Sequence, residues 1–427
     1  LITQILEKTH RMKILIRQAT IIDDRHPDNG KAKDILIEDG VIKKIAGAIK
    51  SKVDETIEAK GLCVSIGWMD LRANFRDPGD EQKEDLSSGL KAAVKGGFTA
   101  VGVMPSTHPA VDCKSDVEYI LSKGHIAPIE IVPIGSVSKE RKSESLAEMY
   151  DMSLAGARAF TDDKKSIREA GLLNRALLYS KSLEQTLMHF PYDDKLIPDG
   201  QINEGSVSTA MGLRGIPEVS ETMMVERDLS LAHYNEAPLH LGPLSSAKSV
   251  DTIYHARQAG AQVTCEVALA NLVYNEEVLE DYRTVYKVLP PLRTEDNRLE
   301  LIEALRAGRI DVVSSDHLPE DEENKKLEFE HAAFGMAAIE LFFPLLWTGL
   351  DEKVDLQTLV STFSFNPRLI LGMEIPKIKV GEKANLTLFS TKEKTKVDRK
   401  KLETKAYNVP ELGKTLKGKV LCTIFSR

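Results

Sequence analysis

Acidic side chains in the middle of the chain are the first candidates for chemistry, because each follows closely on a short apolar segment. These acids are Asp162, Asp163, Asp193, Asp194, Asp316 and Glu320. Carboxylate oxygens are suitable ligands for hard cations such as Mg²⁺. One prediction from these residues is therefore an oxygen-lined metal site, and with it an enzyme that depends on the metal.

The segments before these acids have strand-like composition, and amphipathic helical patterns follow most of the predicted strands. The eight predicted strands are residues 65–70, 98–103, 130–134, 157–160, 184–189, 238–241, 262–266 and 310–315. The predicted helices include residues 166–182, 218–233 and 296–307. Eight strand–helix units predict an α/β fold of the (β/α)₈ TIM barrel type. Chemistry in such a barrel lies at the C-terminal ends of the strands, where these acids are placed.

The two ends of the chain have a different pattern. Asp39-Gly40 separates two strand-like segments, which predicts a hairpin because both turn positions require positive φ. Residues 385–389 and 419–425 also have strand patterns, with no long helical pattern near them. The two termini are therefore predicted to complete one small β-domain.

Composition and charge disfavour two classes of partner. The chain has 427 residues, with 57 Lys and Arg against 65 Asp and Glu, for a net charge of −8. A nucleic acid or an anionic membrane surface would favour a basic protein face, so neither is predicted as a partner. The longest apolar run, residues 341–347, is too short to span a bilayer. Only residues 392–405 are locally basic, and we predict a solvated surface segment there.

Cysteine usage and the first residues bear on the compartment. The four cysteines are scattered without a C-x-x-C pair, which argues against a zinc ribbon and a disulfide framework: Cys63, Cys113, Cys265 and Cys422. Residues 1–11 contain Glu7, Lys8 and His10 and lack the apolar core of a secretory signal. We therefore expect a cytoplasmic protein with an N-terminal extension.

A set of short motifs from about Met12 to the C-terminus resembles the dihydroorotases of the cyclic amidohydrolase superfamily. They are Asp70-Leu71, Phe75-Arg-Asp-Pro-Gly79, Gly96-Gly-Phe-Thr99, Met104-Pro105, Thr161-Asp-Asp163, Gly215-Ile-Pro217, Pro290-Pro-Leu-Arg293, Asp316-His317, Phe334-Gly335 and Asn366-Pro-Arg368. The resemblance implies an amidohydrolase-type TIM barrel at residues 65–374. It also implies a composite β-sandwich domain built from residues 12–64 plus 375–427.

Most residues that hold metal in that family are missing here. The His-x-His of the first strand corresponds to Arg72 and Asn74, and the later histidines correspond to Phe190 and Pro243. Ligand-type residues survive only at Asp163 and Asp316. Two carboxylates do not make a catalytic zinc site, which needs about three protein ligands and one open position. The resemblance with these losses predicts a non-catalytic, metal-ligand-deficient member of the family.

Several residues that would bind substrate in the family are also replaced here. Arg76 corresponds to the family arginine that pairs with the substrate carboxylate, and Ser106 replaces its companion asparagine. Leu289 and Glu320 replace an asparagine and a histidine, and the carboxylate of Glu320 would repel an anionic substrate. Arg76 could still bind an anion or pair with a nearby acid such as Asp77.

The surviving acids need a counter-charge. Asp316 corresponds to the family's general base, here vestigial, because no metal-bound water is available for it to serve. We predict that Arg72 replaces the metal charge and pairs with Asp163, Asp316 or both, since a buried carboxylate pair without a cation is costly. His317 is interpreted as structural support.

These observations lead to one function and two alternatives. The resemblance predicts a catalytically inactive dihydroorotase-like protein of pyrimidine biosynthesis, a homo-oligomer that acts as a structural partner of aspartate carbamoyltransferase and needs no cofactor. One alternative is an active, zinc-dependent cyclic amidohydrolase with altered ligands, interconverting N-carbamoyl-aspartate and dihydroorotate. The other is a self-assembling structural protein of the dihydropyrimidinase-like kind, without a carbamoyltransferase partner.

Overall fold

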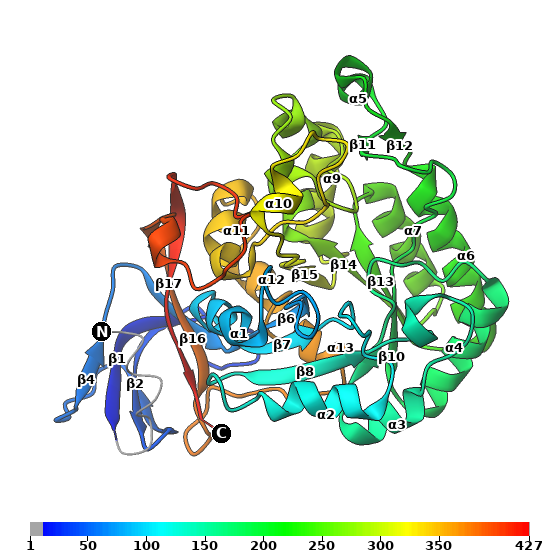
Figure 1. Cartoon of the computed structure of the whole chain (residues 1–427). Coiled ribbons are helices and arrows are strands. Elements are labelled where there is room, and N and C mark those ends of the chain that lie inside the picture. Colours follow the sequence, from blue (N-terminus) through cyan, green and yellow to red (C-terminus); the bar gives the residue numbers. More distant parts are fainter. Residues whose placement is uncertain (1–11, 427) are drawn as a thin grey trace.

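The computed structural model describes residues 12–426, so the predicted N-terminal extension, residues 1–11, lies outside the described residues. Eight parallel strands form a barrel with helices around it, and a second sheet lies beside the barrel (Figure 1). This confirms the predicted fold class. Within residues 12–426, no helix has both the length and the apolar character needed to cross a membrane.

The barrel strands follow one another around the ring in chain order. They are β6 (Trp68–Ala73), β7 (Phe98–Val103), β8 (Glu130–Gly135), β9 (Ala159–Phe160), β10 (Thr186–His189), β13 (Leu239–Leu244), β14 (Val263–Ala268) and β15 (Val312–Ser314). A parallel bridge between Ala73 and His317 closes the ring. Beside it, the Ser315 backbone N–H donates to Asp70 Oδ1 at 3.0 Å. The C-terminal ends of all eight strands therefore meet at one mouth.

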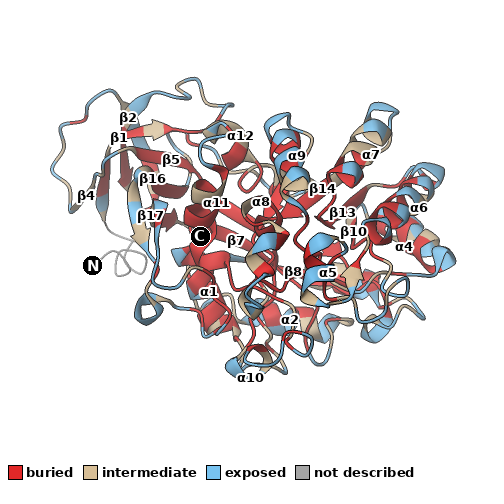
Figure 2. Cartoon of the chain, turned by 90° about the horizontal axis from the view of Figure 1, so that it is seen from above, coloured by how far each residue is buried: buried red, intermediate tan, exposed pale blue. Residues whose placement is uncertain are grey.

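Helices surround the strands on the outside of the barrel. The longer ones are α1 (Leu86–Lys95), α2 (Lys114–Ser122), α3 (Met149–Ala155), α4 (Ala170–Ser182), α6 (Val219–Asn235), α7 (Ala247–Gln258), α9 (Glu295–Arg306) and α11 (Phe342–Leu350). Several begin at capping side chains: Asp85, for example, accepts a hydrogen bond from the Ser88 N–H at 2.7 Å. The barrel strands are buried in Figure 2, and the exposed residues of the barrel helices lie on their outer faces.

Shorter elements lie between the barrel units, except for η6, which lies between β16 (Asn385–Lys396) and β17 (Thr415–Phe425) of the second sheet. They are α5 (Ser206–Met211), α8 (Leu269–Val273), α10 (Glu322–Lys325), α12 (Leu356–Ser361), α13 (Asn366–Ile370), β11 (Ile202–Asn203), β12 (Gly215–Ile216), and the 3₁₀ turns η2 (Lys139–Arg141), η3 (Glu276–Leu279), η4 (Thr284–Tyr286), η5 (Ile339–Leu341) and η6 (Arg399–Lys401). Strands β11 and β12 pair in parallel and, with α5, form the projection at the top of Figure 1.

The second sheet combines strands from both ends of the chain. It contains β1 (Lys13–Ile21), β2 (Ala32–Glu38), β3 (Val41–Ala46), β4 (Glu55–Ile57), β5 (Leu62–Ile66), β16 (Asn385–Lys396) and β17 (Thr415–Phe425). The predicted hairpin joins β2 and β3, and Asp39 and Gly40 have φ of 50° and 74°. C-terminal β16 pairs antiparallel with N-terminal β5, which joins the two chain ends. The domain limits at residues 64 and 375 stay a prediction.

The first predicted barrel strand is wrong in one respect. Residues 65–70 belong to two strands, because β5 ends at Ile66 in the second sheet and β6 begins at Trp68 in the barrel. Gly67 separates them, and a Cβ there would lie 2.1 Å from both Asn385 Oδ1 and Thr99 Oγ1. The apolar run is continuous across this boundary, so composition does not reveal the change of sheet.

Candidate functional site

Arg72 lies at the centre of the barrel mouth. It belongs to β6, and its side chain is fully buried. Its Nη1 donates to Asp163 Oδ1 at 2.8 Å, its Nε donates to Glu266 Oε1 at 2.5 Å, and its Nη2 donates to the Gly242 carbonyl at 3.1 Å. One guanidinium therefore connects β6, the first strand of the barrel, with β13, β14 and the loop after β9.

The three charges in this cluster stabilise one another. Burial opposes the charge of Arg72, but the carboxylates of Glu266 and Asp163 outweigh it and raise the pKa of the guanidinium. Burial would raise the pKa of Asp163, but the nearby cations, Arg72 first, hold that pKa at about 2. Ser106 also donates its hydroxyl hydrogen to Asp163 Oδ2. The Arg72 cluster is thus a set of buried charges that depend on each other.

Asp316 has a different cation. Lys164 Nζ lies 2.7 Å from Asp316 Oδ1 and donates to the Leu289 carbonyl at 2.8 Å. Burial raises the pKa of Asp316, with Lys164 and then Arg72 opposing the rise, and burial lowers the pKa of Lys164. The prediction for Arg72 is therefore confirmed for Asp163, whereas the direct ion pair of Asp316 is made by Lys164.

Comparison with known proteins shows the family to which this chain belongs. Residues 61–249 match the family model described as dihydro-orotase-like. A dihydroorotase of Acetivibrio thermocellus is 37% identical over 96% of this chain and 97% of its own length. A dihydroorotase of Caldicellulosiruptor saccharolyticus is 38% identical over 97% of each chain. The chain belongs to the dihydroorotase-like amidohydrolase family.

Solved structures agree with this dihydroorotase-like fold. The L-hydantoinase (dihydropyrimidinase) from Arthrobacter aurescens has a TM-score of 0.83 at 21% identity, covering 96% of this chain and 94% of its own. A D-hydantoinase has a TM-score of 0.80 at 22% identity, covering 97% and 95%. At this level of identity, the likeness supports the arrangement of the barrel and the second sheet and does not bear on the reaction.

Other side chains occupy the positions where the family resemblance implies metal-binding histidines. Asn74 is buried, and neither its amide nitrogen nor its amide oxygen has a hydrogen-bond partner among residues 12–426. Phe190 is buried and stacks on Tyr192 with ring centroids 5.4 Å apart. Its ring lies 5.4 Å from Lys164 Nζ. Pro243 is part of β13. None of these groups provides an imidazole.

The histidines near the mouth bond to or pack against other protein groups, and Nε2 of His240 alone among the ring nitrogens of His189 and His240 has no hydrogen-bond partner within residues 12–426. His189 Nε2 accepts from the Ile167 N–H at 2.8 Å, and its Nδ1 lies 2.6 Å from Asp228, so it is a satisfied core histidine. His240 Nδ1 bonds to Thr264 Oγ1 at 2.8 Å, and burial lowers the pKa of His240 to about 4. Buried His317 stacks edge-on to Phe75, as expected for a structural residue.

A catalytic zinc ion, implied by the family, does not fit these residues. Each surviving carboxylate is paired with a resident cation, and zinc sites need about three ligands and an open position. Among residues 12–426, the one group of His, Cys, Asp or Glu with metal-like spacing is Asp112, Cys113 and Asp116. That group begins α2 and contains neither Asp163 nor Asp316. The acids predicted to line a Mg²⁺ site do not form such a group within the described residues: Asp162, Asp163, Asp193, Asp194, Asp316 and Glu320.

The residues predicted to bind a substrate anion have internal partners. Arg76 Nη2 donates to Glu320 Oε1 at 2.5 Å, and its Nε donates to the Pro319 carbonyl at 3.3 Å. Lys83 Nζ lies 2.9 Å from the other oxygen of Glu320. Glu320 and the Pro319 carbonyl thus occupy two donors of Arg76 that an anionic substrate would need. Anion binding by Arg76 and Ser106 stays a prediction.

Two residues of the site were missed in the sequence. Glu266 is the only charged residue of β14, and such a lone carboxylate in a buried strand signals a buried partner. Lys164 follows Asp163 directly in the chain. The sequence analysis predicted only Arg72 as a replacement for the metal charge. In the structure two cations pair with the acids, Arg72 with Asp163 and Lys164 with Asp316.

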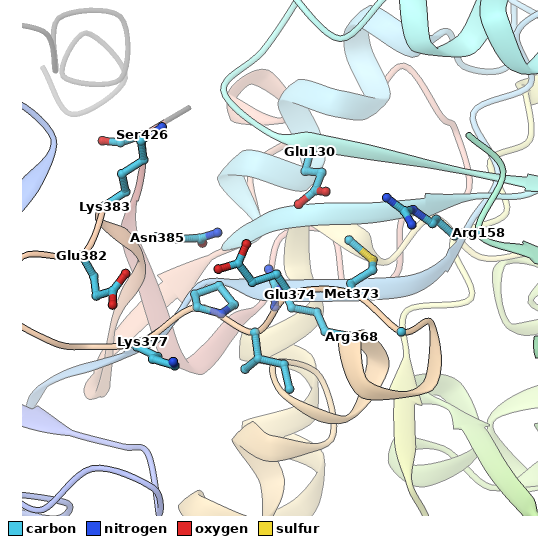
Figure 3. A pocket seen from close by; sticks show the side chains of 13 residues that line it. Glu130, Arg158, Arg368, Met373, Glu374, Lys377, Glu382, Lys383, Asn385 and Ser426 are labelled. Atoms are coloured by element: carbon cyan, nitrogen blue, oxygen red, sulfur yellow. The ribbon is translucent and has the colours of Figure 1, made fainter. Parts of the chain in front are cut away.

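A separate cleft of about 440 Å³ lies at the other end of the barrel strands (Figure 3). Glu130, the first residue of β8, lines it together with Arg158 and Glu374, and Asn385 lines it from β16 of the second sheet. Catalysis in TIM barrels takes place at the C-terminal ends of the strands. We therefore assign this cleft to the seam between the barrel and the second sheet.

Proposed function

We propose that this chain is a catalytically inactive dihydroorotase-like protein of pyrimidine biosynthesis. The observation that carries the proposal is the Arg72 cluster, in which a guanidinium bonds to Asp163 and Glu266 at 2.8 and 2.5 Å. Lys164 makes a second such replacement at Asp316. Fixed cations neutralise the carboxylates but cannot lower the pKa of a bound water to about 7, as zinc does.

The substrate side of the site supports the same proposal. Glu320 is buried and forms ion pairs with both Arg76 and Lys83, so an incoming substrate carboxylate would have to displace Glu320. Like charges disfavour that exchange, since a displaced Glu320 would remain beside the substrate. The proposed loss of activity thus rests on both the absent imidazoles and the occupied arginine.

We propose further that the chain forms homo-oligomers and serves as a structural partner of aspartate carbamoyltransferase in the cytoplasm. This part of the proposal comes from the resemblance to metal-ligand-deficient dihydroorotases. The four cysteines are free in the structure, which supports a reducing compartment: Cys63, Cys113, Cys265 and Cys422.

Elemental analysis of the purified protein, with an assay of dihydroorotate hydrolysis with and without added Zn²⁺, tests the first part. We expect less than about a tenth of an equivalent of metal and no turnover. The dihydroorotase of Acetivibrio thermocellus is the positive control. If the Asp316→Asn variant shows the same turnover as the wild type, the activity comes from a contaminating enzyme. About one or two equivalents of metal with turnover abolished in Asp316→Asn would refute the proposal and establish the active amidohydrolase.

Sedimentation of the chain with aspartate carbamoyltransferase from the same organism tests the second part. We expect a complex heavier than either protein alone. Self-association of the chain without any complex would instead favour the self-assembling structural protein.

A further inference from the structure

The basic stretch of residues 392–405 leaves an unbalanced surface charge. Its three acids all serve other partners: Glu393 pairs with Lys419 at 2.9 Å, Glu403 lies 3.6 Å from Lys95, and Asp398 accepts from the Lys400 backbone N–H at 3.1 Å. Five lysines have no acidic partner among residues 12–426: Lys392, Lys394, Lys396, Lys400 and Lys401. The acids of the stretch therefore do not neutralise its own lysines.

Two of these lysines lie on one side of a strand. Residues 394 and 396 follow the register shift of β16 and are both exposed at alternating positions, so their side chains share a face. Lys394 is also directly opposite Lys417 of β17 in the register, and Lys417 pairs with Asp351 at 2.5 Å. Lysines without an acidic partner are therefore concentrated beside this pair, in a chain whose net charge is −8.

A groove of about 400 Å³ runs beside these lysines, between the β16–β17 hairpin and the barrel helices α1 and α11. Its charged lining is mostly basic, with five lysines, Lys95, Lys394, Lys396, Lys401 and Lys419, against two acids, Glu340 and Asp398. Its remaining wall includes apolar side chains, which are Leu341, Pro344, Leu402 and Val420. A solvated strand face would account for the lysines, but not for the apolar groove beside them.

We propose that this groove docks an acidic segment of a partner protein, with an apolar side chain of the segment seated among Leu341, Pro344 and Val420. Charge complementarity selects an anionic occupant, and the apolar wall favours a peptide over a phosphodiester backbone. The groove shares no residue with the Arg72 cluster, so docking here is independent of the barrel mouth. Naming aspartate carbamoyltransferase as the partner rests on the proposed function, whereas the groove itself does not.

The test uses the full chain and a fluorescein-labelled acidic peptide, Glu-Asp-Glu-Leu-Asp-Glu-Glu, in fluorescence anisotropy titrations. The variant Lys394→Glu/Lys396→Glu/Lys401→Glu should bind the peptide about tenfold or more weakly. The matched control Lys43→Glu/Lys44→Glu/Lys50→Glu changes the net charge equally at exposed lysines of the second sheet, and should bind as wild type does. Replacing the peptide's Leu by Gly should also weaken binding.

A second measurement keeps the test decisive if the triple variant folds poorly. Peptide binding to the wild type should weaken strongly in about 0.5 M NaCl, where exposed charges are screened. No saturable peptide binding, equal losses in both triple variants, or tighter binding of a short oligothymidylate than of the peptide would overturn the proposal.

Sedimentation with aspartate carbamoyltransferase separates the two proposals. A complex with the wild type that is lost in the groove variant and kept in the control supports docking of that enzyme at the groove. An undiminished complex with the groove variant would refute docking of the enzyme there. Absence of any complex with the wild type would refute the partner named under the proposed function, and the peptide titration would still decide the groove.

Discussion

Replacing Arg72 by Met should destabilise the protein more than any loss of a surface charge. The substitution keeps the volume of the side chain but leaves Asp163 and Glu266 buried without their cation. Removing one partner of a buried ion pair costs about 3–5 kcal/mol of unfolding free energy. We therefore expect a loss of that size at pH 7, measured by urea denaturation.

Two comparisons separate the buried charge from other effects of the substitution. In Arg72→Met/Asp163→Asn/Glu266→Gln no carboxylate is left without a cation, and most of the lost stability should return. Arg306→Met breaks a pair with Glu303 whose side chains are both more than half exposed, and should lower the stability far less than Arg72→Met does.

The loss should also depend on pH, with a sign that follows from linkage. In the wild type the pKa of Asp163 is about 2, below its unfolded value, so this carboxylate stabilises the fold above about pH 4 and the contribution disappears as the pH falls toward 2. Without Arg72 the pKa should rise, so the penalty should shrink between pH 7 and pH 4 as the buried carboxyl takes up a proton. Stability of Arg72→Met within about 0.5 kcal/mol of wild type at pH 7 would refute the reasoning.

Three further outcomes are expected. Lys164→Met should lower the melting temperature more at pH 7 than at pH 4, because it leaves the carboxylate of Asp316 without its ion pair; an equal loss at both pH values would contradict this. Gly242→Ala should lower the melting temperature, because the new Cβ would lie 2.4 Å from Glu266 Cγ. An unchanged melting temperature would show that β14 can shift without cost and would contradict this. Burial lowers the pKa of Lys325 to about 7, below its unfolded value, so the unfolded state binds more protons above that pH. Stability from this group should therefore rise from about pH 7 toward pH 10, and Lys325→Met should flatten that rise in urea denaturation.

Much of the fold follows from local patterns that the sequence displays. Residues 98–103 are predicted as a strand and form β7 with the same limits, because an apolar run followed by a helix pattern suits a strand buried in a parallel sheet. The Asp39-Gly40 hairpin is equally local. The boundary at Gly67 is not, since the apolar run continues while the chain passes from one sheet to the other.

The sequence by itself determined that Arg72, Asn74, Phe190 and Pro243 stand where the resemblance implies histidines, and that Asp163 and Asp316 are present. It could not determine how these acids are neutralised, because Arg72 and Glu266 are separated by nearly the whole barrel in sequence. Only closure of the barrel brings Nε of Arg72 within 2.5 Å of Glu266 and directs Lys164 to Asp316. Burial then favours the pairing, since a charge removed from water is costly unless an opposite charge or hydrogen-bond partners face it, whatever their position in the chain.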